Sequence, residues 1–522
     1  MPNSQVLLLW LIVFLASLTG LRLQSATPLQ IRVGVKELTP IQRTNFVRCV
    51  LWLKTHPSSY DTTGSGLNAY DWMVKLHKDG FEAHLAGGSG VHMAPSFFPW
   101  HREYLLAFER ELQRAARELG IPETVTLPYW DWTDPETAPL VFRDDFLGGN
   151  GSGNNAAFTN GLPNTRNSPF RVRSGPFATR DDRTTEFLVS TNAAVSGTSP
   201  QGPPRFFLQR AIGTHRIFSP VVGTTPPEYP TAELLDLLPK TNEIAHALQM
   251  TLYDLAAWDY TVETNLQFLE RTTFRNYMEG HTGLLNVFTE EPFGDQIHGR
   301  VHLWMGGNMS SSSSPNDPLF WLHHANLDRI WAEWQDRQGI FNFPAEWTYL
   351  NSNSNTVSVV ATEVLWGFNK AAGYPNDITS LDTLEIRASG VRYDTQAESA
   401  PAQLVAFVSR INDSTRLEVR VAAVRGLQYQ MEAAQQADGP WTASGPAVIA
   451  EGSELRFERI TGSGETTREF LRLRITAAPN QPVVGERVRL LLSGRPSSEP
   501  RCGVDPLAKP STASADRPRR DY

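Results

Sequence analysis

The clearest pattern of apolar and polar positions in the chain runs from residue 100 to residue 119. Leu105, Phe108 and Leu112 follow one another at steps of three or four residues, which places them on one face of an α-helix. Gly120 comes directly afterwards, and glycine is frequent just past the end of a helix. The pattern therefore predicts an amphipathic helix over this segment.

Helical spacing also occurs elsewhere in the first two thirds of the chain. It predicts further helices over residues 67–84, 231–257, 298–305 and 318–336. Residues 133–230 are instead rich in Gly, Asn, Thr, Pro and Arg, a composition typical of loops. The serine run at 310–314 is expected to be a flexible connector between the last two helices. We therefore predict a mainly helical domain that carries long loops.

The pattern changes after about residue 395. Short apolar and β-branched runs, separated by Gly, Ser, Asn and Asp, replace the helical spacing. These runs are Leu404–Phe407, Leu417–Val421, Tyr429–Glu432, Leu455–Phe457 and Phe470–Ile475. They predict a small C-terminal β-sandwich over residues 396–495. Residues 496–522 are rich in Pro, Ser and Arg, which predicts a disordered tail.

The first 26 residues differ from the rest of the chain. Val6–Gly20 is almost uninterrupted apolar sequence, and small residues follow at Ser25 and Ala26. Such a run is short for a membrane span and suits the core of a signal peptide, although no Lys or Arg precedes Arg22. We predict a cleaved signal at residues 1–26 and a secreted or periplasmic protein with no membrane segment after cleavage. An uncleaved N-terminal anchor is the alternative.

Composition limits the classes of function. The chain has 522 residues, of which 40% are hydrophobic and 20% charged, as is ordinary for a soluble protein with a sizeable core. The predicted helical domain occupies residues 27–395. The formal net charge is -8 and no concentrated basic stripe stands out, so we expect no nucleic-acid partner. Two cysteines, Cys49 and Cys502, make no disulfide framework; one bridge and two unpaired thiols both stay open.

The histidines carry the chemistry of this sequence. Of twelve, four lie within residues 77–101 and four within residues 298–324, and neutral imidazole is a common metal ligand. His298 and His302 are four residues apart, so on a helix both rings share one face and can reach one metal. Two partly exposed helix histidines are the alternative. Gly299 stands where a zinc protease would carry its general-base Glu, which argues against that class.

His323 and His324 follow in a strongly apolar segment, so their helix is expected to be buried. Adjacent side chains on a helix point about 100° apart. Only one of the pair can therefore easily join His298 and His302. Asp328 lies four residues after His324 and could accept the second ring N–H of a ligating histidine.

A second set of histidines mirrors the first. His92 and His101 are nine residues apart, and His77 and His84 both lie on the preceding predicted helix. Two separate sets of three histidines, with nitrogen donors alone, suit copper better than structural zinc or iron–sulfur clusters. The sequence therefore indicates a two-metal site, with a purely structural role for each cluster as the alternative.

Four segments resemble the tyrosinase family. His92–Leu105 resembles its first copper motif and Pro315–Asp328 its second, and Leu127–Trp132 and Phe274–Gly280 also match. The resemblance covers roughly residues 40–370 and is highly specific. Tyrosinases, catechol oxidases and molluscan haemocyanins share these motifs.

The resemblance implies a four-helix bundle that holds two copper ions, which react with O2. For the first copper, it implies the ligands His77, His92 and His101. For the second copper, it implies the ligands His298, His302 and His324. His77 is preferred to His84 because Tyr70–Asp71 stands before it, as a similar pair stands before the first ligand of the family. His323 is then a neighbour or packing residue.

The resemblance also implies the function: oxidation of catechols to o-quinones, with hydroxylation of monophenols left open, on small phenolic substrates and with O2. Glu279 matches an acidic residue that orients a water for substrate deprotonation, although a structural Glu at a helix end is the alternative. A haemocyanin-like oxygen carrier is the rival function, but the chain has one copper unit and no repeat. Gly90 stands where some relatives carry a cysteine, so no thioether to His92 is expected.

Overall fold

The computed structural model describes most of the chain in segments. These are residues 29–62, 64–85, 91–152, 170–178, 187, 189, 207–212, 229–254, 273–279, 297–340, 342–350, 356–397, 404–411, 414–422, 428–434, 440–450, 454–461, 469–476 and 483–492. The predicted signal peptide, the predicted tail and Cys502 lie outside them. In the described part, no helix has both the length and the apolar character to cross a membrane.

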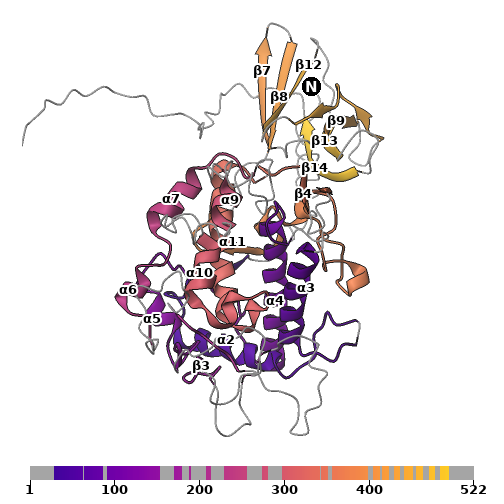
Figure 1. Ribbon diagram of the computed structural model, residues 1–522. Coiled ribbons are helices and arrows are strands. Elements are labelled where there is room, and N and C mark those ends of the chain that lie inside the picture. Colours follow the sequence, from indigo (N-terminus) through magenta and orange to yellow (C-terminus); the bar gives the residue numbers. More distant parts are fainter. Residues whose placement is uncertain are drawn as a thin grey trace, which may run out of the picture.

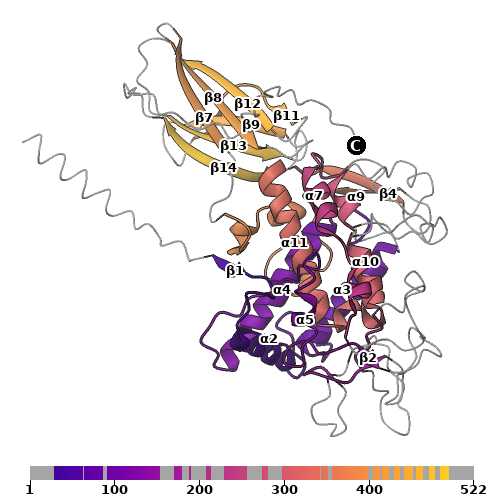
Figure 2. The same cartoon turned by 90° about the vertical axis from the view of Figure 1, so that its left-hand side faces the viewer.

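Four helices pack side by side at the centre of the molecule (Figures 1 and 2). They are α3 (Ala69–Leu85), α4 (Phe97–Glu118), α10 (Ile297–Met305) and α11 (Leu319–Gln338). Large aromatic side chains such as Trp100, Trp321 and Trp331 are almost fully buried between them, and burial of this apolar area drives their association. The predicted mainly helical domain is confirmed, with each of these helices where the sequence pattern predicts it.

Smaller helices surround this bundle. α2 (Pro40–Leu53) packs against α4, and Thr39 begins it with a capping box to Gln42. Two more peripheral helices are α7 (Thr241–Gln249), which contacts α11, and α9 (Phe274–Glu279), which contacts α10. A four-residue helix, α5 (Ala138–Val141), lies in the predicted loop region.

The single helix predicted over residues 231–257 is wrong. The structure has α6 (Ala232–Leu235) and α7, and the chain between them leaves the helical conformation. Pro239 has no N–H to give to a helix and disfavours the helical conformation of the residue before it. Lys240 is extended, with φ -104° and ψ 156°.

Short strands close the helical domain. β1 (Gln30–Arg32) pairs in parallel with β6 (Val391–Tyr393), so the two ends of the predicted domain lie side by side. The hairpin of β4 (Glu346–Leu350) and β5 (Thr356–Val360), which the sequence pattern did not predict, lies between α11 and β6 in the sequence. β2 (Gly151–Ser152) and β3 (Arg171–Val172) form another small ladder.

The C-terminal region is built from strands, as predicted. One antiparallel sheet has the order β12–β8–β7 and the other has β10–β9–β13–β14, with β11 also paired to β9. Their bounds are β7 (Leu404–Ile411), β8 (Ser414–Ala422), β9 (Gln428–Ala434), β10 (Thr442–Ala443), β11 (Val448–Ile449), β12 (Glu454–Thr461), β13 (Glu469–Thr476) and β14 (Val483–Leu492). The five predicted runs fall in β7, β8, β9, β12 and β13. That the two sheets pack as a sandwich stays a prediction.

Candidate metal centre

Three histidines from α3, α4 and the segment between them meet inside the bundle. His77 lies on α3, His101 lies near the start of α4, and His92 lies in the connecting segment. One ring nitrogen from each lies within 4.8 Å of the others, and all three side chains are buried. The structure thus brings the first predicted set together. His84 also lies on α3, but its side chain is outside the described residues.

Backbone carbonyls set the ring orientations in this first set. His77 Nδ1 lies 2.7 Å from the carbonyl oxygen of Ser312, and His101 Nδ1 lies 2.8 Å from that of Phe97. A carbonyl oxygen only accepts, so each Nδ1 carries the proton and each Nε2 keeps a lone pair. Both Nε2 atoms are buried and have no hydrogen-bond partner in the described part of the chain. This is the state in which a histidine binds a metal.

The second predicted set is arranged in the same way. His298 and His302 lie on α10, and their Nδ1 atoms lie 3.3 Å from the carbonyl oxygen of Glu279 and 2.7 Å from that of Met309. His324 lies on α11, and its Nε2 is 3.2 Å from Nε2 of His302. Imidazole nitrogens that share one metal ion at about 2.0 Å, with tetrahedral angles, are roughly 3.3 Å apart. The two rings are therefore spaced as ligands of a common ion.

His323 lies in this second group but is held differently. The indole N–H of Trp132 donates to His323 Nδ1 over 3.1 Å, and both side chains are buried. Because an indole N–H only donates, Nδ1 must be unprotonated and the ring proton sits on Nε2. His323 is therefore in the opposite tautomer to His298 and His302. Its Nε2 offers a proton in place of a lone pair, which favours His324 as the ligand.

The two sets face each other across a short gap. The rings of His101 and His324 are stacked with centroids 4.6 Å apart, and those of His92 and His298 lie 6.2 Å apart. The Phe97 ring packs against both sets, with its centroid 4.5 Å from His101 and 5.0 Å from His298. The six predicted ligands thus form one centre that can hold two ions close together.

Burial keeps these histidines neutral. It lowers the pKa of His77 to about 3 and that of His302 to about 4, and the pKa values of His101, His298 and His324 are also well below the ordinary one. A neutral ring has a lone pair to give, whereas an imidazolium has none. Each of the two groups of clustered metal-binding side chains found among the described residues contains histidine alone. This donor set fits copper.

Glu279 ends α9 beside both sets, although its carboxylate is not part of either. Its Oε1 accepts the backbone N–H of Met93 over 2.5 Å, and its Oε2 accepts from Arg275 Nη1 over 2.9 Å. Burial raises the pKa of the Glu279 carboxyl to about 7, and Arg275 and the Met93 N–H limit this rise. Glu279 is 1% exposed, so its carboxylate is shielded from solvent.

The segment between α10 and α11 is part of the centre, which the sequence pattern did not indicate. Residues 310–314 were expected to be a flexible connector. They lie instead between two short 3-10 turns, η3 (Gly307–Ser310) and η4 (Ser314–Asn316), and they are half-buried. The carbonyl groups of Met309 and Ser312 hold one histidine of each set. Every residue has a backbone carbonyl, so the amino-acid sequence contains no signal for these contacts.

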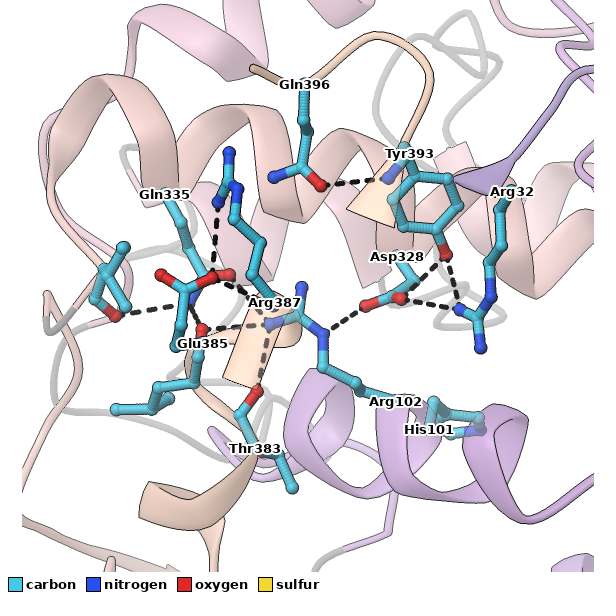
Figure 3. Close-up of polar contacts among 12 residues, drawn as sticks. Arg32, His101, Arg102, Asp328, Gln335, Thr383, Glu385, Arg387, Tyr393 and Gln396 are labelled. Carbon is cyan, nitrogen blue, oxygen red and sulfur yellow. Dashed lines mark hydrogen bonds and ion pairs between the residues drawn. The ribbon is translucent and has the colours of Figure 1, made fainter. Parts of the chain in front are cut away.

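The expectation that Asp328 orients a ligating histidine is wrong. Its Oδ1 accepts from Arg102 Nε over 2.6 Å, and its Oδ2 accepts from the Tyr393 hydroxyl over 2.7 Å and from Arg32 over 3.3 Å (Figure 3). Asp328 therefore links α11 to α4 and to strands β1 and β6. Two buried arginines attract the carboxylate more strongly than a neutral imidazole does.

Known proteins share the part of the chain that holds this centre. Residues 67–337 match the family described as the common central domain of tyrosinase. The chain is 33% identical over 309 residues to the tyrosinase of Streptomyces glaucescens, which covers 59% of this chain and 83% of that protein. The chain belongs to the tyrosinase family.

One further relative and one solved structure are also similar to this chain. The grixazone synthase of Streptomyces griseus is 34% identical over 316 residues, which is 58% of this chain and 82% of that protein. A solved polyphenol oxidase variant from Thermothelomyces thermophila is 22% identical over 59% of this chain and 70% of its own, with a TM-score of 0.37. As a member of the tyrosinase family, the protein is a phenol oxidase of the tyrosinase type with a dicopper centre, and the buried histidines are suited to hold two copper ions.

Cys49 lies in α2, far in sequence from the histidines. Its side chain is fully buried and it is a free thiol in the described part of the chain. Burial raises its pKa to about 12, so the thiol stays protonated and unreactive. Cys502 lies outside the described residues, so one bridge between the two cysteines and two unpaired thiols both stay open.

Proposed function

We propose that the protein oxidises catechols to o-quinones with O2 at a dicopper centre, and that the six predicted histidines are its ligands. The first copper takes His77, His92 and His101, and the second takes His298, His302 and His324. The observation that carries this proposal is the pair of facing, buried histidine sets, in which four of the six rings have Nδ1 at a backbone carbonyl and Nε2 left with a lone pair.

The copper pair supplies the redox chemistry, because two ions together can pass two electrons from a catechol to O2. The protein supplies orientation and protection from water. The carbonyl groups of Ser312, Phe97, Met309 and Glu279 keep the ligand rings in one tautomer. The Phe97 ring fills space beside both sets, so that water does not occupy it.

The proposal assigns Glu279 to the deprotonation of substrate. A phenol has a pKa near roughly 10 and must lose its proton before the oxygen can bind a metal. The support is that the Glu279 carboxylate is buried and accepts the N–H of Met93, the residue after the proposed ligand His92, while the backbone carbonyl of Glu279 lies beside the proposed ligand His298. It is thus the acidic side chain best placed among the described residues to orient a water for this step.

We further propose that diphenol oxidation is faster than monophenol hydroxylation. Efficient monophenolases of the family often have Asn directly after the first ligand of the second copper, where it helps to hold the water used for deprotonation. This chain has Gly299 at that position on α10, and glycine has no side chain to offer. A diphenol loses its first proton more easily at a copper pair and depends less on this assistance.

The experiment that tests the function uses the full chain purified with copper. We expect about two coppers per chain, O2 uptake with catechol, and slower turnover of the matching monophenol. Reversible O2 binding with no catechol turnover would instead identify an oxygen carrier and overturn the proposal. Copper loading without any oxygen-dependent absorbance would overturn both.

We also propose that the protein acts outside the cytoplasm, in a secreted or periplasmic form. The support is the apolar segment Val6–Gly20, which suits a signal peptide. N-terminal sequencing of protein recovered from the medium or periplasm should find a start near residue 27. Recovery of the intact N-terminus in the membrane fraction would support the anchor instead.

A further inference from the structure

The residue that follows the proposed ligand His92 has a strained backbone. Met93 has a φ of 58°, in the left-handed region, where a Cβ approaches the carbonyl oxygen too closely. Among the described residues, Phe170 is the other non-glycine residue with a positive φ. A residue in this region is strained and persists only where its surroundings hold it.

The carboxylate of Glu279 holds Met93 in this conformation. Its Oε1 accepts the Met93 N–H over 2.5 Å, which is short for a bond to a backbone amide. The other oxygen is fixed by Arg275, whose Nε in turn donates to Asp254 over 2.5 Å. Arg275 is fully buried and Glu279 is 1% exposed, so this chain of ion pairs has little freedom to move.

Glu279 also touches the second set of ligands. Its backbone carbonyl lies 3.3 Å from His298 Nδ1 and keeps the proton on that nitrogen. One residue therefore contacts the backbone next to a ligand of the first copper and the ring of a ligand of the second. Its side chain serves the first contact and its main chain the second, so a change of side chain acts on the first contact directly.

We propose that Glu279 is a positioning residue for the first copper: its carboxylate clamps the strained Met93 backbone and so aims the His92 ring into the ligand set. This inference rests on the proposed ligand set and is separate from the deprotonation role, because it needs the carboxylate as a hydrogen-bond acceptor and not as a base. Without the clamp, residue 93 relaxes to a negative φ and the His92 ring leaves its place.

The test compares the copper affinity of the unchanged full chain with that of three variants by competition with a chelator. Glu279→Ala should weaken binding at the first copper by about 10- to 100-fold, as loss of a residue that orients a metal ligand usually does. Adding Met93→Gly to Glu279→Ala should recover at least about tenfold, because glycine adopts a positive φ without a clamp. Adding Met93→Ala should recover nothing, because alanine keeps the Cβ and its strain.

This design separates the clamp from a general loss of stability. In both double variants Arg275 lacks its partner Glu279, so any folding defect from that loss is equal in the two. The melting temperature of the copper-free proteins gives a readout without metal, and the Gly variant should melt above the Ala variant. If Glu279→Ala does not fold, the same pair of changes at residue 93 is made in Glu279→Leu, whose side chain also lacks an oxygen acceptor, and the same order of affinities is expected.

Three results would overturn the clamp. They are unchanged copper affinity in Glu279→Ala, recovery by Met93→Ala equal to that by Met93→Gly, and no recovery by Met93→Gly. The variant His92→Ala tells this failure apart from a failure of the proposed function. If His92→Ala keeps both coppers at full affinity, the ligand set itself is wrong.

Discussion

A single hydrogen bond at each histidine decides what its other ring nitrogen can do. In four of the proposed ligands, a backbone carbonyl takes the Nδ1 proton and leaves a lone pair on Nε2. At His323 the indole of Trp132 donates to Nδ1, and the proton is left on Nε2. Adjacent residues on one helix thus differ in function because their partners differ in hydrogen-bonding type.

This difference predicts unequal effects for the two adjacent histidines. His324→Ala should remove one copper per chain and nearly all oxidase activity, because a three-histidine site is left with two ligands. His323→Ala should keep two coppers and most of the activity. Copper per chain, measured with catechol oxidation on the same samples, checks both. Full copper and activity in His324→Ala would refute the assignment.

The lack of a side chain at Gly299 leads to a prediction about the balance between monophenol and diphenol turnover. Gly299→Asn should raise the ratio of monophenol to diphenol turnover, because the new amide can help hold the water that deprotonates the phenol. Initial rates on a monophenol and its matching diphenol measure this ratio, and copper content serves as the control. An unchanged or lower ratio at equal copper loading would contradict the role given to that water.

At the scale of elements, the distance between the two histidine sets depends on how α4 and α11 are joined. Arg102 follows His101 on α4, and Asp328 follows His324 by one helical turn on α11. Their side chains form a buried ion pair at 2.6 Å (Figure 3). The Arg102 guanidinium also stacks over Trp331, 3.7 Å from the ring centroid. This pair ties together two helices that carry one ligand of each copper.

Removing this tie should be costly. Asp328→Ala leaves Arg102 buried without its carboxylate, and loss of one partner of a buried pair costs about 3–5 kcal/mol. Denaturant unfolding of the copper-free protein should show this loss in the free energy of unfolding. Asp236→Ala, which breaks an exposed pair with Lys240, is the matched control and should leave that free energy unchanged. Equal stability of both variants would show that the tie is unimportant.

At the scale of the whole molecule, the end of the helical domain is anchored in the bundle. Tyr393 is fully buried, and its hydroxyl bonds Asp328 just before the C-terminal strands begin. Gln396 accepts from the Tyr393 N–H, which holds the chain to this point. Tyr393 is thus a core residue of the helical domain. Because β6 pairs with β1, a C-terminal segment that can be removed without damage to this domain must begin after β6.

We predict that the C-terminal strands cap the active site until they are removed. A tethered cap competes with substrate at high local concentration, and cutting the tether turns it into a weak bimolecular contact. Limited proteolysis that removes residues beyond about 400 should raise catechol oxidation several-fold at unchanged copper content. The alternative is an independent binding or stability module. Equal or lower activity of the trimmed protein at equal copper loading would favour that module.

The sequence by itself determined the helices of the bundle, the strands after residue 395 and the histidines that gather at the centre. Apolar periodicity is a local property, and ligand-bearing motifs keep their spacing along the chain, so both are visible in one dimension. The interruption between α6 and α7 at Pro239 is also a local feature, but the sequence pattern did not predict it because apolar residues keep helical spacing on both sides. The motif similarity pointed to the family, which the match over residues 67–337 confirms.

Only the tertiary structure decided how these residues are used. The carbonyl groups of Met309 and Ser312 come from a serine-rich segment that looked like a connector, because any residue can supply a backbone acceptor. The sequence suggested that Asp328 orients a histidine. In the structure it binds Arg102, Arg32 and Tyr393, which are up to 296 residues away in sequence. A hydrogen bond depends on distance and direction in space, and spacing along the chain does not contain either.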